Sequence, residues 1–145
     1  MNDNEATKAL LRETNAGIQM GVSSLSGIMG DVESGELRRV IHDSKLEHDR
    51  LGGEAHKMLH LYGSDTKEPH PIAKAMSNVK TAVKMAADRS DRTAAGLITD
   101  GCAMGIKSLN HYLNLYRNAD AEAVSLTKRV IRSEERLIND VKGFL

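Results

Sequence analysis

The sequence predicts an all-α protein, an antiparallel four-helix bundle made of two helical hairpins. Apolar residues recur at the three- and four-residue spacing of a buried helix stripe. Glycine and proline divide the 145 residues into long helical segments, and part of the first segment resembles part of the third. The length suits one domain. We therefore expect one helical-bundle domain over residues 1–145, with hairpins at 5–62 and 90–144 and a crossover at 63–89.

Two seams of inward-facing positions predict the first hairpin. In the segment 5–32, apolar side chains return every seven residues, at Leu11, Ile18, Leu25 and Val32. A second helix is expected to begin after Ser34, a residue type that caps helix N-termini, and to end at Gly63. The seam of this second helix comprises Leu37, Ile41, Ser44, His48, Leu51, Ala55, Met58 and Tyr62.

The remainder of the chain predicts three further helices. Residues 63–71 have the composition of a loop, and an extra helix is expected over 72–89, within the crossover. Ser90 and Asp120 are candidate caps for helices over 91–117 and 120–144. The apolar stripe that begins at Ile72 continues in phase, so one helix over 72–117 is the alternative. Such a helix would greatly exceed the usual ~11–12 residues, which favours a break.

Composition excludes several classes of protein. Twenty Lys and Arg residues balance twenty Asp and Glu, so the basic field typical of nucleic-acid binders is missing. The three tyrosines and one phenylalanine offer little for base stacking. No apolar run approaches the ~20 residues of a membrane span, and the start lacks the pattern of a signal peptide. We expect a cytoplasmic protein that binds neither nucleic acid nor membranes.

Two nonapeptides in the chain resemble each other. The stretches 17–25 and 101–109 share glycine, methionine, glycine, serine and leucine at the same positions, which predicts an internal repeat of the hairpin. The alternative is that helical segments rich in Gly and Ser look alike by composition. Each stretch places two glycines one helical turn apart, and such faces permit close helix approach. We therefore expect tight packing of these two helices, and a homodimer, through Gly17, Gly21, Gly101 and Gly105.

Two hairpins joined by a long connection resemble the ferritin-like four-helix bundle, and within it small bacterial domains of unknown function. The resemblance implies a di-metal site, with one Glu from each of two helices and Glu-x-x-His from each of the others. This chain has no Glu-x-x-His, since Arg50 follows Glu47 and Lys57 follows Glu54 at that spacing. We therefore expect a non-catalytic structural or interaction protein without a cofactor.

His48 is the most informative polar residue because it occupies a seam position, as Glu134 does in the last helix. Burial of a charge is costly unless the charge is paired, so the two side chains are expected to meet. One interpretation is a polar layer that fixes helix register. The alternative is a metal-binding oxidoreductase or metal store, in which iron or another transition metal binds His48, Glu47, Glu54 and Glu134. A third hypothesis is an apolar-ligand binder, which needs an enclosed apolar cavity of roughly 300 Å³ or more.

The other candidate residues are expected to be structural. Cys102 falls on an apolar stripe, which predicts a small buried hydrophobe rather than a nucleophile. His111 is expected at the edge of the core. Solvated histidines are expected at His42, His56 and His60. Methionine is expected to fill the core at Met20, Met29, Met58 and Met104.

Overall fold

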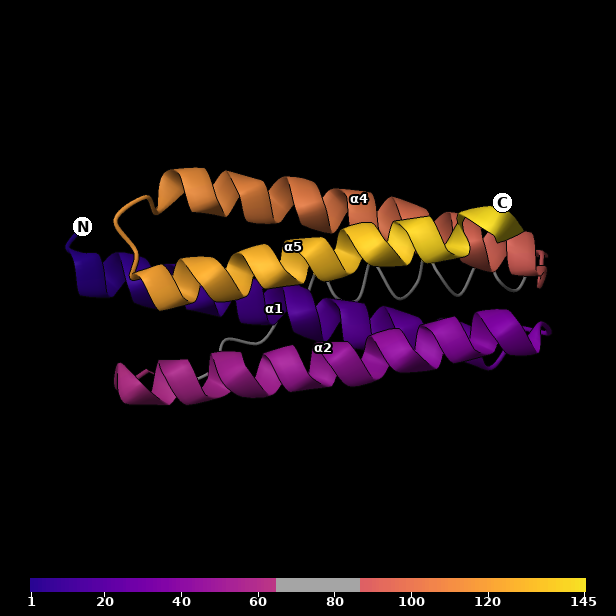
Figure 1. Cartoon of the computed structure of the whole chain (residues 1–145), viewed down its shortest axis with the longest axis horizontal. Coiled ribbons are helices and arrows are strands. Elements are labelled where there is room, and N and C mark those ends of the chain that lie inside the picture. Colours follow the sequence, from indigo (N-terminus) through magenta and orange to yellow (C-terminus); the bar gives the residue numbers. More distant parts are fainter. Residues whose placement is uncertain (65–86) are drawn as a thin grey trace.

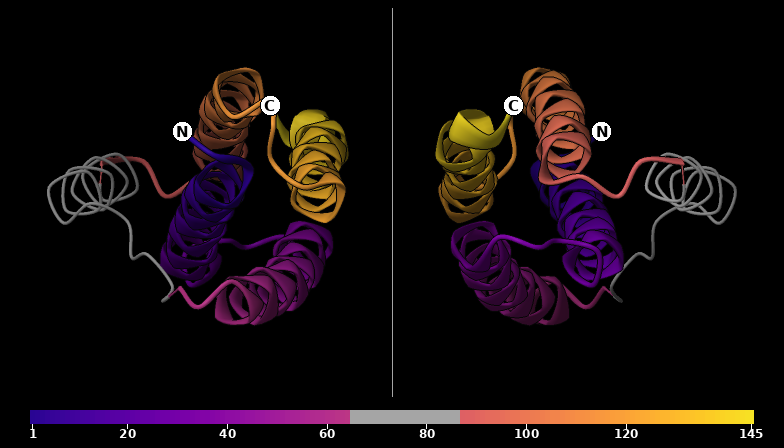
Figure 2. Two further views of the ribbon diagram at one scale, coloured as in Figure 1. Left: turned by 90° about the vertical axis from the view of Figure 1, so that its left-hand side faces the viewer. Right: turned by 90° about the vertical axis from the view of Figure 1, so that its right-hand side faces the viewer.

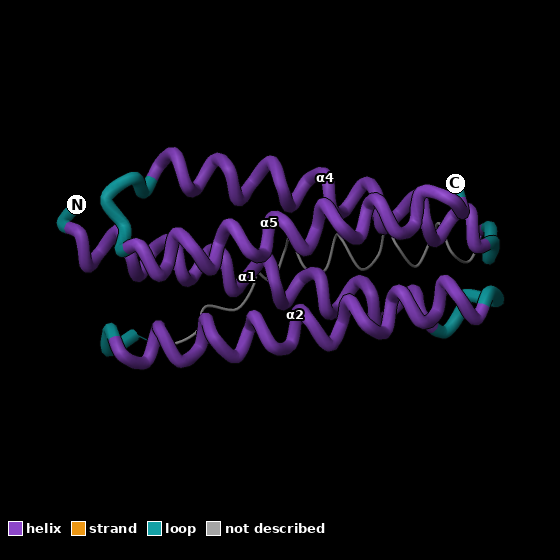
Figure 3. Tube along the Cα trace, viewed as in Figure 1, coloured by secondary structure: helices purple, strands orange, loops and turns teal. Residues whose placement is uncertain are grey.

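The computed structural model describes residues 1–64 and 87–145, and within these ranges four long helices run alongside one another (Figure 1). They are α1 (Asp3–Met29), α2 (Gly35–Leu61), α4 (Asp91–Leu115) and α5 (Ala121–Val141), followed by a short 3₁₀ turn, η1 (Lys142–Phe144). Figure 3 shows that only short loops separate α1 from α2 and α4 from α5. The described part of the chain contains no strand, and the predicted all-α class is confirmed.

The four helices form an antiparallel bundle, which Figure 2 shows from both ends. The hairpin partners α1 and α2 pack along each other, as do α4 and α5. The bundle is closed by contacts of α2 with α5 and of α1 with α4, and α1 also reaches α5. The two hairpins are therefore those that the apolar seams predict. None of the helices within the described ranges is apolar and long enough to cross a membrane.

Hydrogen bonds at the helix ends show why the helices begin and stop where they do. The Ser34 hydroxyl accepts a bond from a first-turn amide of α2, and the Ser90 hydroxyl does the same for α4, as predicted. Gly63 has a φ of 67° and terminates α2, because this left-handed conformation suits glycine. Asp120 precedes α5 but makes no side-chain cap bond. Its carboxylate instead accepts a hydrogen bond from the Tyr62 hydroxyl.

The region before α4 decides between the two alternatives for residues 72–117, which are one continuous helix or two helices with a break. Residues 88–90 are not helical, so a continuous helix over 72–117 is not formed. Ser90 and Asp88 explain the break locally, since both Ser90 and Thr93 hydrogen-bond the Asp88 carboxylate. Most of the extra helix expected over 72–89 lies outside the described residues, and its described end stops before residue 88.

The apolar core of the bundle consists of two clusters. One lies at the α1–α2 turn and includes Leu25, Ile28, Val32, Leu37, Ile41, Ala95, Ile98, Leu137 and Val141. The other lies toward the opposite end and includes Leu10, Leu11, Ile18, Leu51, Leu59, Leu109, Leu126, Val130 and Ile131. Burial of these side chains is the main stabilising contribution expected for such a bundle. On all four helices the two clusters are separated by a short stretch near the middle, and this stretch holds the candidate site.

Candidate functional site

A layer of four residues crosses the middle of the bundle between the two apolar clusters. Each helix supplies one member, namely Gly21 of α1, His48 of α2, Gly105 of α4 and Glu134 of α5. A Cβ atom on Gly21 would lie 3.0 Å from Cδ2 of His48, and one on Gly105 would lie 3.9 Å from Oε2 of Glu134. The two large polar side chains of this central layer therefore point toward the two glycines.

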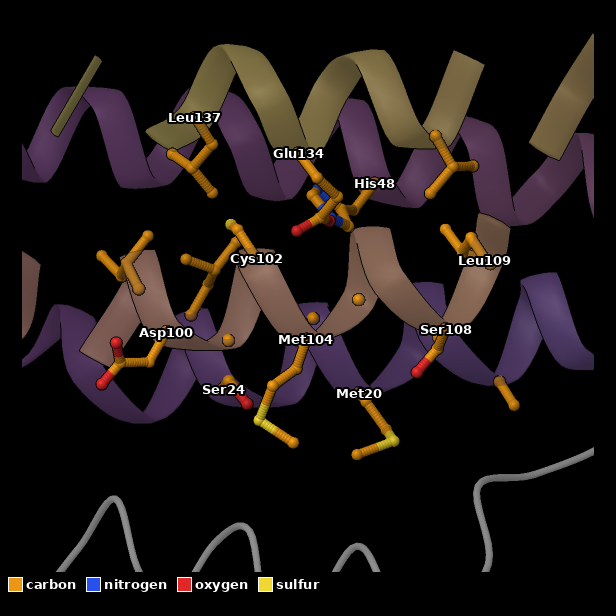
Figure 4. Close-up of a pocket in the computed structure, with 18 of the residues that line it drawn as sticks. Met20, Ser24, His48, Asp100, Cys102, Met104, Ser108, Leu109, Glu134 and Leu137 are labelled. Atoms are coloured by element: carbon orange, nitrogen blue, oxygen red, sulfur yellow. The ribbon is translucent and has the colours of Figure 1, made fainter. Parts of the chain in front are cut away.

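His48 and Glu134 form a direct pair inside the bundle. Nε2 of His48 lies 2.5 Å from Oε1 of Glu134, and the two side chains point toward one another in Figure 4. Nδ1 of His48 lies 2.7 Å from the carbonyl oxygen of Ser44, one turn earlier in α2. A carbonyl oxygen can only accept, so Nδ1 carries a proton and the ring orientation is fixed. The pairing that the seam positions predict is confirmed.

Electrostatics favour the protonated form of the His48 ring. Burial lowers the pKa of His48, but the hydrogen bond and negative charge of Glu134 raise it. The Ser44 carbonyl and the charge of Glu47 act in the same direction, so the pKa ends above its ordinary value of 6.5. The central layer therefore contains a histidine–carboxylate pair in which both ring nitrogens have partners.

Cys102 of α4 lies next to this pair. Burial raises the pKa of its thiol, and the charge of Glu134 and a hydrogen bond with it raise the pKa further. The side chain is buried and forms no disulfide. A thiolate is the reactive form of cysteine, and these surroundings keep Cys102 protonated at neutral pH. The prediction of a small buried hydrophobe at this position is confirmed.

A groove of about 420 Å³ lies between α1 and α4, with His48 and Glu134 among its lining residues. Its walls are mostly apolar or small side chains, and Figure 4 shows several of them around the pair. From α1 the lining includes Gly17, Met20 and Ser24. From α4 it includes Gly101, Met104 and Ser108. The volume exceeds the roughly 300 Å³ expected of an apolar-ligand site, but the space is a groove and not the enclosed cavity that the sequence-based hypothesis required.

The glycines of α1 and α4 widen this groove, and the predicted close packing of the two helices at these glycines is wrong. Nothing lies within 4 Å of the position that a Cβ on Gly101 would take, and the nearest atom to that of Gly17 is a Leu109 side-chain atom at 4.0 Å. The space beside Gly21 is filled by the His48 ring from another helix. Close helix approach occurs instead at Gly52 of α2, where a Cβ would lie 3.2 Å from Nε2 of Gln19.

The fold as a whole matches a solved structure. Dps92 from Deinococcus radiodurans, of the ferritin-like Dps family, superposes with a TM-score of 0.75 over 100% of this chain and 88% of that chain, at 14% sequence identity. The chain has the ferritin-like four-helix-bundle fold. At this identity the similarity concerns the fold alone. No protein-family model matches the sequence, and no curated protein does.

The central layer of this ferritin-like bundle does not fit the di-metal centre that the resemblance implies. Two of its four positions are glycines, and His48 and Glu134 use their facing atoms on each other. Nη1 of Arg136 lies 3.0 Å from both carboxylate oxygens of Glu47. Among the described residues, no three His, Cys, Asp or Glu side chains are grouped so that they could hold a metal ion.

Glu54, the last member of the sequence-derived metal set, also has another partner. Nη1 of Arg129 lies 3.0 Å and 2.8 Å from its two carboxylate oxygens. The structure therefore brings His48 and Glu134 together, but engages Glu47 and Glu54 with arginines of α5. Sequence reasoning missed both arginines, because their partners depend on how α2 and α5 are aligned.

The remaining candidates fall on the surface or at the groove. His42, His56 and His60 are exposed, as predicted. His111 is exposed rather than at the edge of the core, and its ring meets Tyr112 edge to face with centroids 5.4 Å apart. Met104 is 67% exposed, so its prediction as core filler is wrong. Partly buried methionines are Met20, Met29 and Met58.

Proposed function

We propose that this ferritin-like chain is a non-catalytic binding protein, and that the groove between α1 and α4 takes a small, largely apolar molecule. The observation that carries the proposal is the groove of about 420 Å³ over the His48–Glu134 pair. Small-molecule sites typically have volumes of ~300–1,000 Å³, apolar walls and a few fixed polar groups. The groove has all three of these properties.

The state of the polar groups supports a binding role rather than catalysis. A general acid or base must reach the reacting atom and exchange a proton with it. Both nitrogens of His48 are occupied, by Glu134 and by the Ser44 carbonyl, and the ring is 1% exposed. Cys102 is buried and held as the thiol. These groups are therefore suited to shape and polarise the groove.

The glycines give independent support. Glycine in a helix interior costs about 1 kcal/mol relative to alanine. Glycine at position 21 has a structural explanation, because the His48 ring packs against it. Gly17 and Gly101 lack such close neighbours and line the groove. Larger side chains at these positions would project into the groove, so glycine at both positions is consistent with an open binding site.

Binding of 1-octanol tests this proposal directly. Isothermal titration calorimetry should show saturable binding of 1-octanol to the native chain. Gly105→Leu should abolish it, because its side chain fills the groove. Gly96→Leu is the matched control, since Gly96 lies on the same helix, has open space around it and does not line the groove. Equal binding by the two leucine variants, or no binding to the native chain, would contradict the proposal.

A homodimer through the same face is the second candidate function. It is supported by Met104, which is 67% exposed, and by the scarcity of charge nearby. No charged residue lies between Glu13 and Asp31, and only Lys107 lies between Asp100 and Arg117. Exposed apolar surface that is poor in charge is typical of protein interfaces. Light scattering coupled to gel filtration should report a dimer for the native chain and a monomer for Met104→Glu.

A further inference from the structure

We propose that the groove selects an organic amine, with the ammonium group on Glu134 and an apolar body along the methionines of α1 and α4. This inference rests on the proposed function and specifies the chemical class of the ligand. Three features of the groove carry it, namely the charge of its lining, the second carboxylate oxygen of Glu134 and the side chains around that oxygen.

The charged residues of the groove are mostly acidic. Its lining includes Glu13, Asp100 and Glu134, together with His48, and no Lys or Arg is among the described residues that line it. His48 pairs with Glu134, and Asp100 adds a further carboxylate to the lining, which makes the groove acidic. An apolar cleft with charges of one sign concentrates its field on the opposite sign. The groove is therefore complementary to a cation and repels a carboxylate.

The carboxylate of Glu134 lies at this groove, next to the Cys102 thiol that hydrogen-bonds it. Its Oε1 is engaged by Nε2 of His48 at 2.5 Å. Its Oε2 lies 3.9 Å from the position that a Cβ on Gly105 would take, and Gly105 itself lines the groove. The Glu134 side chain is 12% exposed. An ammonium group that enters beside Gly105 can donate a charge-assisted hydrogen bond to Oε2, which is stronger than a bond between neutral groups.

The outer edge of the groove suits the apolar body of such a ligand. Met20 of α1 and Met104 of α4 both line the groove, and Figure 4 shows their side chains pointing away from the His48–Glu134 pair. Methionine is flexible and polarisable, so it adapts to ligands of irregular shape. The absence of a Cβ at Gly105 and Gly101 leaves the approach to the carboxylate open.

Three eight-carbon probes with different head groups test the inference. Calorimetry at neutral pH compares octylamine, 1-octanol and octanoate on the native chain. We expect octylamine to bind about tenfold more tightly than 1-octanol, because a hydrogen bond between charged groups is stronger than one that a neutral hydroxyl makes. Octanoate should bind most weakly. Equal affinity for octylamine and 1-octanol overturns the inference but leaves the proposed function intact, whereas no binding of any probe overturns both.

Two substitutions on α5 locate the selectivity. Glu134→Gln keeps the size of the side chain and removes its charge. The affinity for octylamine should therefore fall to within about threefold of the affinity for 1-octanol. Glu135→Gln is the matched control, because Glu135 is exposed and outside the groove lining, and it should retain the full preference. Asp100→Asn provides a second test, because Asp100 is an exposed residue of the groove lining. It should weaken the binding of octylamine and leave the binding of 1-octanol unchanged. Unchanged preference in both Glu134→Gln and Asp100→Asn overturns the inference.

Discussion

Nε2 of His48 lies 2.5 Å from Oε1 of Glu134, at the level between the two apolar clusters of the bundle. The pair joins α2 to α5, and the carbonyl of Ser44 fixes the other ring nitrogen. A polar pair at one level of a bundle favours a single alignment of its helices, because any shift leaves a buried charge without its partner. The same pair gives the adjoining groove its polar centre.

Loss of the Glu134 charge is expected to destabilise the bundle. Glu134→Gln leaves the buried His48 ring without its carboxylate, and the free energy of unfolding should fall by about 1–3 kcal/mol. Glu135→Gln changes an exposed neighbour and should remain within about 0.5 kcal/mol of the native chain. Urea unfolding at neutral pH measures both values. Equal stability of the two variants would show that the pair contributes nothing.

Stability is expected to depend on pH through His48. Its pKa is raised in the folded protein, so the folded chain holds this proton more tightly than the unfolded chain does. The contribution to the free energy of unfolding is complete below the unfolded value near 6.5 and is lost as pH rises through the folded pKa. Urea unfolding at several pH values should show this decrease in the native chain and a smaller decrease in His48→Gln. An increase over the same range would be inconsistent with the pair.

Two glycine-to-alanine substitutions should have opposite effects. A Cβ on Gly21 would lie 3.0 Å from Cδ2 and 3.1 Å from Nε2 of His48, so Gly21→Ala is expected to cost about 1–3 kcal/mol through overpacking. Gly101 has nothing within 4 Å of the same position, so Gly101→Ala should stabilise the helix by up to about 1 kcal/mol. Thermal unfolding of both variants tests the contrast. A stabilising Gly21→Ala would mean that the His48 ring moves freely.

Metal analysis tests the alternative site of His48, Glu47, Glu54 and Glu134. Both added glutamates are engaged by arginines, so we expect no stoichiometric metal in protein purified without chelator. Elemental analysis after incubation with ferrous iron or zinc measures the content. One bound ion per chain that is lost in Glu134→Gln but retained in Glu135→Gln would support the alternative instead.

The helices and the His48–Glu134 pair could be predicted because they depend on local patterns. The apolar seams, the N-terminal cap at Ser34 and the helix end at Gly63 can each be predicted from a short stretch of sequence. His48 and Glu134 stand at seam positions, and buried charge requires a partner. Neither the helices nor the pair requires knowledge of how the helices are oriented. The internal repeat between 17–25 and 101–109 stays a prediction.

The groove could not be predicted because it depends on distances between helices. A pair of glycines permits either close packing or an open space, and the sequence does not say which neighbour fills that space. In the structure the His48 ring reaches Gly21, while Gly101 remains open. The engagement of Glu47 by Arg136 likewise depends on the alignment of α2 with α5. The apolar side chain of Met104 predicts a core position, but this side of α4 faces outward.

Methionine methyl groups offer the most direct test of the central claim that the α1–α4 groove binds a ligand. Met20 and Met104 line the groove, whereas Met58 packs against the far apolar cluster. In ¹³C-methyl spectra recorded during titration with octylamine, the signals of Met20 and Met104 should shift saturably while that of Met58 stays in place. Shifts of equal size at all three methionines, or none at Met20 and Met104, would contradict the account.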